Sequence, residues 1–104
     1  MKMVRHILLW KFSRQVIEEG RQREALALMS ASVSNMVGKI PGLIRAEIGG
    51  NLTGNACDFV FYAELEDMDA LAAYQVHPLH VAHKERSAPL VEAPPVVADY
   101  ICGE

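Results

Sequence analysis

The fold is decided by residues 3–12, Met-Val-Arg-His-Ile-Leu-Leu-Trp-Lys-Phe, which are rich in aliphatic and aromatic side chains. This composition predicts a strand over Met3–Phe12. Successive strand residues point to opposite faces, so one face carries Val4, His6, Leu8, Trp10 and Phe12. The other face carries Met3, Arg5, Ile7, Leu9 and Lys11. Both faces are apolar at the strand centre, which indicates that the strand is covered on both sides.

A long helix is expected next, from about Val16 to Gly38. One apolar stripe with three- and four-residue steps indicates it: Leu26, Met29, Val33, Met36 and Ile40. Gly38 and the pair Pro41-Gly42 are expected to end this helix. A second strand is predicted over Leu43–Gly49, with Ile44, Ala46 and Ile48 on one face.

The remaining elements follow from the same kinds of signal. A strand is predicted over Cys57–Leu65, and Asp67 is a good N-cap for a helix over Met68–Val76. Pro78 suits the first position of another helix, which runs to about Arg86. The proline-rich stretch Ala88–Pro95 is expected to be irregular, and Val96–Cys102 is the last predicted strand.

The order strand, helix, strand, strand, helix, strand predicts an α+β, ferredoxin-like βαββαβ fold in a single domain, residues 1–104. Such a domain has one antiparallel four-stranded sheet with helices on one face. The uncovered face would be polar in a monomer, yet Ile7, Leu9 and Val60 lie on it. A homodimer whose two sheets form an α+β barrel is therefore predicted. The alternative is a monomer whose sheet is solvated at its rim by charged residues.

Composition restricts the partners and the location. The 104 residues are 51% hydrophobic, with a formal net charge of −3 and no run of like charges, so no nucleic-acid partner is expected. The apolar runs are too short to span a bilayer, and no signal peptide is recognisable, so no membrane partner is expected. Two cysteines, Cys57 and Cys102, are expected to be free thiols in a cytoplasmic protein.

The candidate chemistry lies in residues 74–83, Tyr-Gln-Val-His-Pro-Leu-His-Val-Ala-His. His80 falls in the first turn of the predicted helix, where the helix dipole disfavours imidazolium, so a neutral ring is available as a base. Tyr74 and His6 are expected to reach the same cavity between sheet and helices, and we name His80, Tyr74 and His6 as candidate catalytic residues. Leu8, Trp10 and His77 are the expected ligand-binding residues.

Each histidine also has a simpler interpretation. His77 precedes Pro78, where its role could be simply to cap a helix, and His83 is expected to face solvent. The three-residue steps of His77, His80 and His83 are a weak zinc signal, so no metal and no cofactor are predicted. The trio His6, Tyr74 and His80 could equally be a buried hydrogen-bonded network without a substrate.

Several motifs resemble those of the stress-responsive dimeric α/β-barrel (Dabb) domain family. They occur in order as Val4–Phe12, Lys39–Gly42, Asp58–Val60, Leu71–Val81 and Ala98–Tyr100. The resemblance implies a ferredoxin-like fold and a homodimeric barrel. It also implies similarity to enzymes of the olivetolic acid cyclase type, which close a polyketide chain by aldol condensation without a cofactor. Their catalytic tyrosine and histidine match Tyr74 and His80, and their first-strand histidine matches His6.

Three functions stay open on the sequence. The first is cofactor-free acid/base catalysis on a small carbonyl compound, with His80 as base and Tyr74 as partner. The second is a non-catalytic, stress-responsive dimer with an apolar ligand, and the third is a cofactor-free monooxygenase. A cavity of several hundred cubic ångströms that reaches His80 would favour the enzyme. A cavity filled by Trp10 would favour the non-catalytic dimer.

Overall fold

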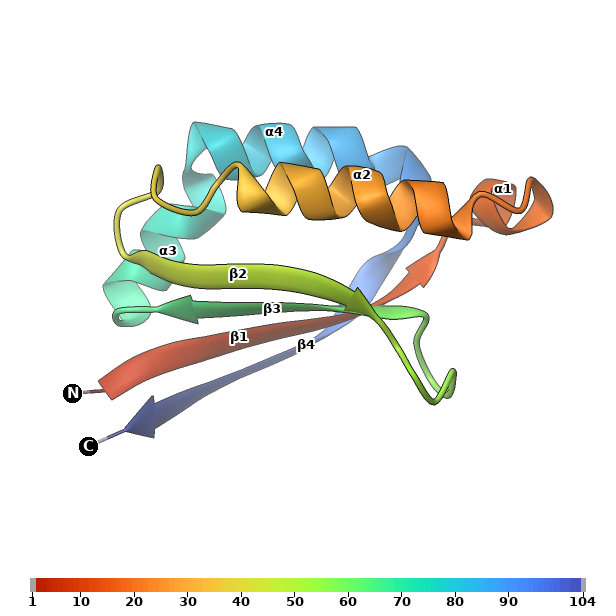
Figure 1. Cartoon of the computed structure of the whole chain (residues 1–104). Coiled ribbons are helices and arrows are strands. Elements are labelled where there is room, and N and C mark those ends of the chain that lie inside the picture. Colours follow the sequence, from red (N-terminus) through yellow and green to blue (C-terminus); the bar gives the residue numbers. More distant parts are fainter. Residues whose placement is uncertain (1, 104) are drawn as a thin grey trace.

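The computed structural model describes residues 2–103, and Figure 1 shows the path of the chain. The elements are β1 (Lys2–Phe12), α1 (Arg14–Glu18), α2 (Gln22–Ser34), β2 (Leu43–Gly50), β3 (Phe59–Leu65), α3 (Met68–Val76), α4 (Pro78–Ser87), a 3₁₀ turn η1 (Ala88–Leu90) and β4 (Val91–Gly103). The sheet order is β2-β3-β1-β4, and all neighbours are antiparallel. The ferredoxin-like prediction is confirmed.

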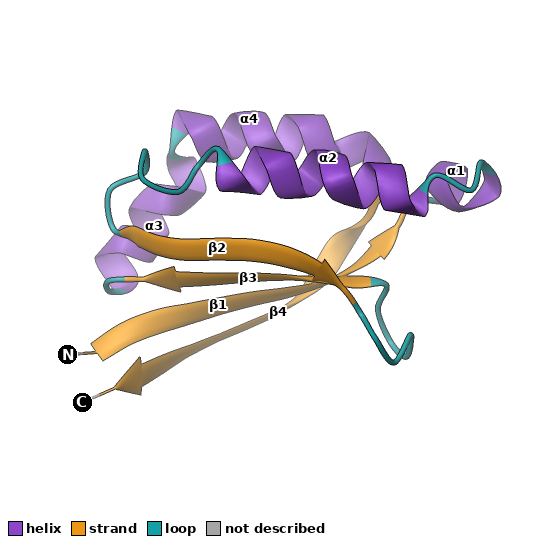
Figure 2. Cartoon of the chain, viewed as in Figure 1, coloured by secondary structure: helices purple, strands orange, loops and turns teal. Residues whose placement is uncertain are grey.

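The helices lie over one face of the sheet only, with α2 and α4 side by side above it (Figure 2). The face of β1 that begins at Val4 points toward them. Val4, His6 and Phe12 are buried, and Leu8 and Trp10 pack against the same core. The central strand is therefore placed as its two-residue alternation predicted.

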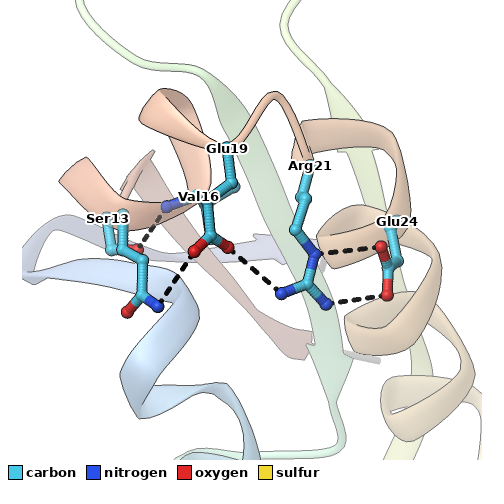
Figure 3. Close-up of polar contacts among 6 residues, drawn as sticks. Ser13, Val16, Glu19, Arg21 and Glu24 are labelled. Atoms are coloured by element: carbon cyan, nitrogen blue, oxygen red, sulfur yellow. Dashed lines mark hydrogen bonds and ion pairs between the residues drawn. The ribbon is translucent and has the colours of Figure 1, made fainter.

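The predicted helix over Val16–Gly38 is two helices, not one. Gly20 has a φ of +65°, a left-handed conformation that L side chains rarely adopt, and it ends α1. Arg21 then joins the two helices by ion pairs to Glu19 before it and Glu24 after it, at 3.3 and 2.8 Å (Figure 3). Ser13 caps α1 by accepting a hydrogen bond from the Val16 N–H.

The helical stripe still forms the core. Met29 and Val33 are buried on α2, and Met36 and Ile40 are buried in the turns that follow it. Helix α2 ends at Ser34, before the predicted stop at Gly38, which has a φ of +85°. The apolar stripe therefore predicted buried residues correctly, but it did not predict the end of the helix.

The second strand departs from its predicted alternation at its first residues. The pairing of β2 with β3 shifts between Leu43 and Arg45. Leu43 is buried as a result, whereas Ile44 is 43% exposed and does not join Ala46 and Ile48 against the core. A β-bulge of this kind reverses the inward and outward positions on one side of the shift.

The last strand is longer than predicted, and the third is shorter. β4 begins at Val91 and includes Pro94 and Pro95, which the sequence placed in irregular chain. Proline is tolerated there because β4 lies at the edge of the sheet and needs hydrogen bonds on one side only. β3 begins at Phe59 and not at Cys57.

Strand β4 separates two environments by alternation. Its pairing with β1 sets Val97 opposite Leu8 and Asp99 opposite His6, on the side of the helices. Val96, Ala98 and Tyr100 therefore lie on the face of the sheet that the helices leave open. Cys57 and Cys102 are both free thiols, as predicted. No helix within residues 2–103 is long and apolar enough to cross a membrane.

Candidate active site

Two consecutive helices place the candidate residues. Asp67 caps α3 by accepting a hydrogen bond from the Ala70 N–H at 2.8 Å. His77 ends α3 and caps α4, because its Nδ1 accepts a hydrogen bond from the Leu79 N–H at 3.1 Å, and Pro78 follows at the first helical position. The tight corner between the helices brings Tyr74, at the end of α3, beside His80, at the start of α4.

A cavity of about 510 Å³ lies between the sheet and this helical corner. His6, Tyr74 and His80 all line it, as do Leu8 and Trp10. The other lining residues come from α2, the strands and the C-terminal part of the chain: Met29, Ile48, Phe59, Phe61, Gln75, His83, Lys84, Ser87, Ala88, Val91, Ala93, Pro95 and Val97. The structure therefore brings the three candidate catalytic residues to one cavity.

Tyr74 is 1% exposed and lies between the two histidines. Its ring centroid is 4.2 Å from that of His80 and 6.2 Å from that of His6. Burial raises the pKa of the phenol, and no hydrogen bond to another described residue contributes to that shift. The hydroxyl therefore keeps its proton and is available as a donor to a ligand in the cavity.

His80 is half-buried, and its tautomer follows from its partner. The ring Nδ1 lies 3.2 Å from the backbone carbonyl oxygen of Gln75. A carbonyl oxygen only accepts, so Nδ1 carries the proton and Nε2 holds the free lone pair. Burial lowers the pKa of His80, and the positive charge of Lys84 acts in the same direction, whereas the Gln75 hydrogen bond opposes them. The ring is a neutral base near pH 7.

His6 is held by a residue that sequence reasoning did not select. It is 5% exposed, and its Nδ1 lies 2.5 Å from Oδ1 of Asp99, its partner on β4. Its ring also meets the edges of Phe61 and Tyr74, at centroid distances of 6.0 and 6.2 Å. In the sequence, Asp99 is only one residue of the Ala98–Tyr100 motif. The register between β1 and β4 decides which β1 residue its side chain faces, and a single sequence does not give that register.

Trp10 forms a wall of the cavity and does not fill it. Its ring stacks on Phe59, with centroids 6.4 Å apart and planes 13° apart. Phe59 in turn packs on Phe12 at 4.9 Å. Trp10 and His80 both line the cavity of about 510 Å³, so the indole does not close it.

The remaining histidines differ from expectation. His77, expected among the ligand-binding residues, caps α4 and is outside the cavity lining that the described residues form. His83, expected to face solvent, is half-buried and lines the cavity. Lys84 also lines it, and the lining within residues 2–103 includes no carboxylate, although Asp99 contacts the lining residue His6. Within the same range, no group of three or more His, Cys, Asp or Glu side chains is arranged to hold a metal ion.

Comparisons with known proteins agree with this architecture. The family model of the Stress Responsive A/B Barrel Domain, Dabb, matches residues 4–102. A dimeric protein of ferredoxin-like fold from Bacteroides fragilis is 27% identical, with 94% of each chain covered and a TM-score of 0.79. A Dabb family protein from Mesorhizobium loti is 26% identical, with 96% of each chain covered and a TM-score of 0.69.

A more distant structure is similar in fold alone. The hydroxynitrile lyase from Passiflora edulis is 17% identical, with 98% of this chain and 94% of that chain covered, at a TM-score of 0.77. A search of curated proteins gave no match.

Proposed function

The chain belongs to the stress-responsive A/B barrel (Dabb) domain family, and from that premise we propose that it is a homodimer whose cavity binds a small carbonyl compound and removes a proton from the carbon beside the carbonyl. His80 is the base and Tyr74 is the hydrogen-bond donor. The observation that carries the proposal is the close approach of these two rings in one apolar cavity, with centroids 4.2 Å apart.

The homodimer is supported by the sheet face that no helix covers. Ile7, Leu9 and Val60 are only half-buried there, and Val96 is 63% exposed. The Nε of Arg5 is enclosed on the same face without a hydrogen-bond partner among the described residues. A second copy would cover the apolar side chains and supply polar partners at the rim. The B. fragilis structure, which is dimeric, supports a homodimer.

The dimer is tested at Ile7, which lies at the centre of that face. Ile7→Asp places a charge where the second copy is expected, so sedimentation equilibrium at micromolar concentration should shift from dimer to monomer. Lys2→Asp, a charge change at an exposed residue at the beginning of β1, is the control. A wild-type protein that sediments as a monomer of 11.5 kDa would contradict the homodimer.

The chemistry follows from the tautomer of His80 and the retained proton of Tyr74. The C–H bond beside the carbonyl breaks, its proton moves to Nε2 of His80, and its electron pair forms an enolate whose oxygen accepts a hydrogen bond from the Tyr74 hydroxyl. Return of the proton completes an isomerisation or exchange. In an aldol-type cyclisation, the enolate carbon attacks a second carbonyl of the same molecule, and the new alkoxide takes the proton back from His80.

The distant fold relative supports the proposal only in a general way. The Passiflora edulis protein is named as a lyase, so this fold can hold an enzyme active site. Its low identity gives no ground for transferring its substrate, because function depends on the site and not on the fold.

The test uses 4-phenylbutan-2-one, an apolar ketone, and follows deuterium exchange of its α-protons in D₂O by NMR. Wild-type protein is expected to accelerate exchange, and His80→Ala should slow it about 100-fold, a typical contribution of a general base. Glu85→Gln, an exposed change on the same helix and outside the cavity, is the matched control. Undiminished exchange in His80→Ala would contradict the base, and a bound ketone without accelerated exchange would favour a non-catalytic binding protein.

A further inference from the structure

His83 lies one helical turn after His80, with ring centroids 6.5 Å apart. Besides the main cavity, it lines a second cavity of about 270 Å³ between α2 and α4. Its ring is tied to the neighbouring helix, because Nδ1 lies 2.8 Å from Oγ of Ser32. His83 is thus a fixed group of the site that the proposed proton transfer does not use.

The tautomer of His83 follows from the other partner of Ser32. Arg86 donates two hydrogen bonds to Oγ of Ser32, from Nε at 3.2 Å and from Nη2 at 2.8 Å. A guanidinium has no acceptor, so Ser32 accepts both bonds, and His83 is the remaining partner of its hydroxyl among the described residues. The Ser32 proton must then point to His83, whose Nδ1 accepts it. The proton of the neutral His83 ring is therefore on Nε2.

His83 stays in this neutral form at physiological pH. Burial, together with the neighbouring His80 and Arg86, lowers the pKa of His83 to about 4. Lys84, the next residue on α4, lowers the pKa of His80 in the same cavity, and no carboxylate lines either cavity within residues 2–103. Nothing described near the ring therefore favours imidazolium.

We propose that Ser32 and Arg86 hold His83 as an N–H donor, so that the site binds a carbonyl compound with a second oxygen acceptor. His80 and His83 then present opposite tautomers from one helix: Nε2 of His80 accepts a proton, and Nε2 of His83 donates a hydrogen bond. One ligand oxygen is bound by the Tyr74 hydroxyl and the other by His83. The ligand class rests on the proposed function, whereas the tautomers do not.

The tautomers are read directly by long-range ¹H–¹⁵N NMR of the histidine rings at pH 7, without a ligand. His83 should be protonated at Nε2 and His80 at Nδ1. Ser32→Ala removes the hydroxyl and should shift His83 toward a mixture of tautomers, whereas Ser32→Thr keeps the hydroxyl and should restore the wild-type pattern. Wild-type His83 protonated at Nδ1 would overturn the proposed role of Ser32 and Arg86. A Ser32→Ala protein with the unchanged Nε2–H tautomer would also overturn it.

The ligand class is tested by the ratio of two dissociation constants. 1-Phenylbutane-1,3-dione has two oxygens, and 4-phenylbutan-2-one, of similar size, has one. Loss of one well-placed hydrogen bond corresponds to roughly a tenfold change in affinity. Ser32→Ala should therefore reduce the preference for the dione about tenfold, measured by calorimetry. An unchanged ratio would overturn the second oxygen site, while deuterium exchange dependent on His80 would still support the proposed function.

Discussion

Replacing Asp99 by leucine is expected to destabilise the protein through His6, because it removes the hydrogen-bond partner of a buried ring. His6 is 5% exposed, and its Nδ1 contacts Oδ1 of Asp99 at 2.5 Å, whereas the Asp99 side chain is one-third exposed. Leaving a buried polar group without a partner costs about 1–3 kcal/mol. In a domain of this size, that corresponds to a fall in Tm of roughly 5–20 °C.

The matched variant removes both polar partners. In His6→Leu/Asp99→Leu no unpaired imidazole remains, so its free energy of unfolding should lie above that of Asp99→Leu alone. The assay is urea denaturation of the four proteins of the cycle at one protomer concentration, since a dimer's stability depends on concentration. The reasoning is refuted if Asp99→Leu lies within about 0.5 kcal/mol of wild type, or if the two substitutions are additive.

Three further predictions concern Tyr74, His80 and one glycine. Tyr74→Phe should change the free energy of unfolding by less than about 1 kcal/mol, because the hydroxyl has no described protein partner, while slowing ketone exchange at least tenfold; a large loss of stability would contradict this. The pH profile of exchange should decline as His80 becomes protonated, with its midpoint below the ordinary histidine pKa because burial lowers the pKa of His80; a midpoint above it would contradict the buried base. Gly42→Ala should lower the free energy of unfolding in urea more than Gly38→Ala does. Both glycines have φ near +85°, but only at Gly42 would the new Cβ lie 2.6 Å from Cβ of Ala70. Equal losses at the two positions would contradict this.

Much of the fold was predictable because its signals are local. The alternation in β1 identified both faces of the central strand, and Asp67 and Pro78 marked the starts of α3 and α4. The errors lie where a local signal is overridden or absent. Gly20 ends α1 before the apolar stripe begins at Leu26, so the stripe carried no signal for this break, and the bulge at Leu43 exposes Ile44. The prolines of β4 are compatible with a strand only because that strand is at the sheet edge.

The candidate site was likewise predictable only where its residues are close in the sequence. Tyr74 and His80 are six residues apart, so helix signals and the proline corner were enough to bring them together. Asp99 is 93 residues from His6, and its contribution depends on the register between β1 and β4, which one sequence does not reveal. His83 was misplaced because its partner, Ser32, comes from another helix, and the packing of α2 on α4 determines that contact.

The alternation of β4 has a consequence for how such a protein can diversify. Val91, Ala93, Pro95 and Val97, at odd positions, line the cavity, whereas Val96, Ala98 and Tyr100, at even positions, lie on the opposite face of the sheet. Substitutions at odd positions can reshape the ligand cavity while the even positions, and the surface they form, stay as they are. Under the proposed function, ligand preference and subunit assembly are thus encoded in one strand but are separately mutable.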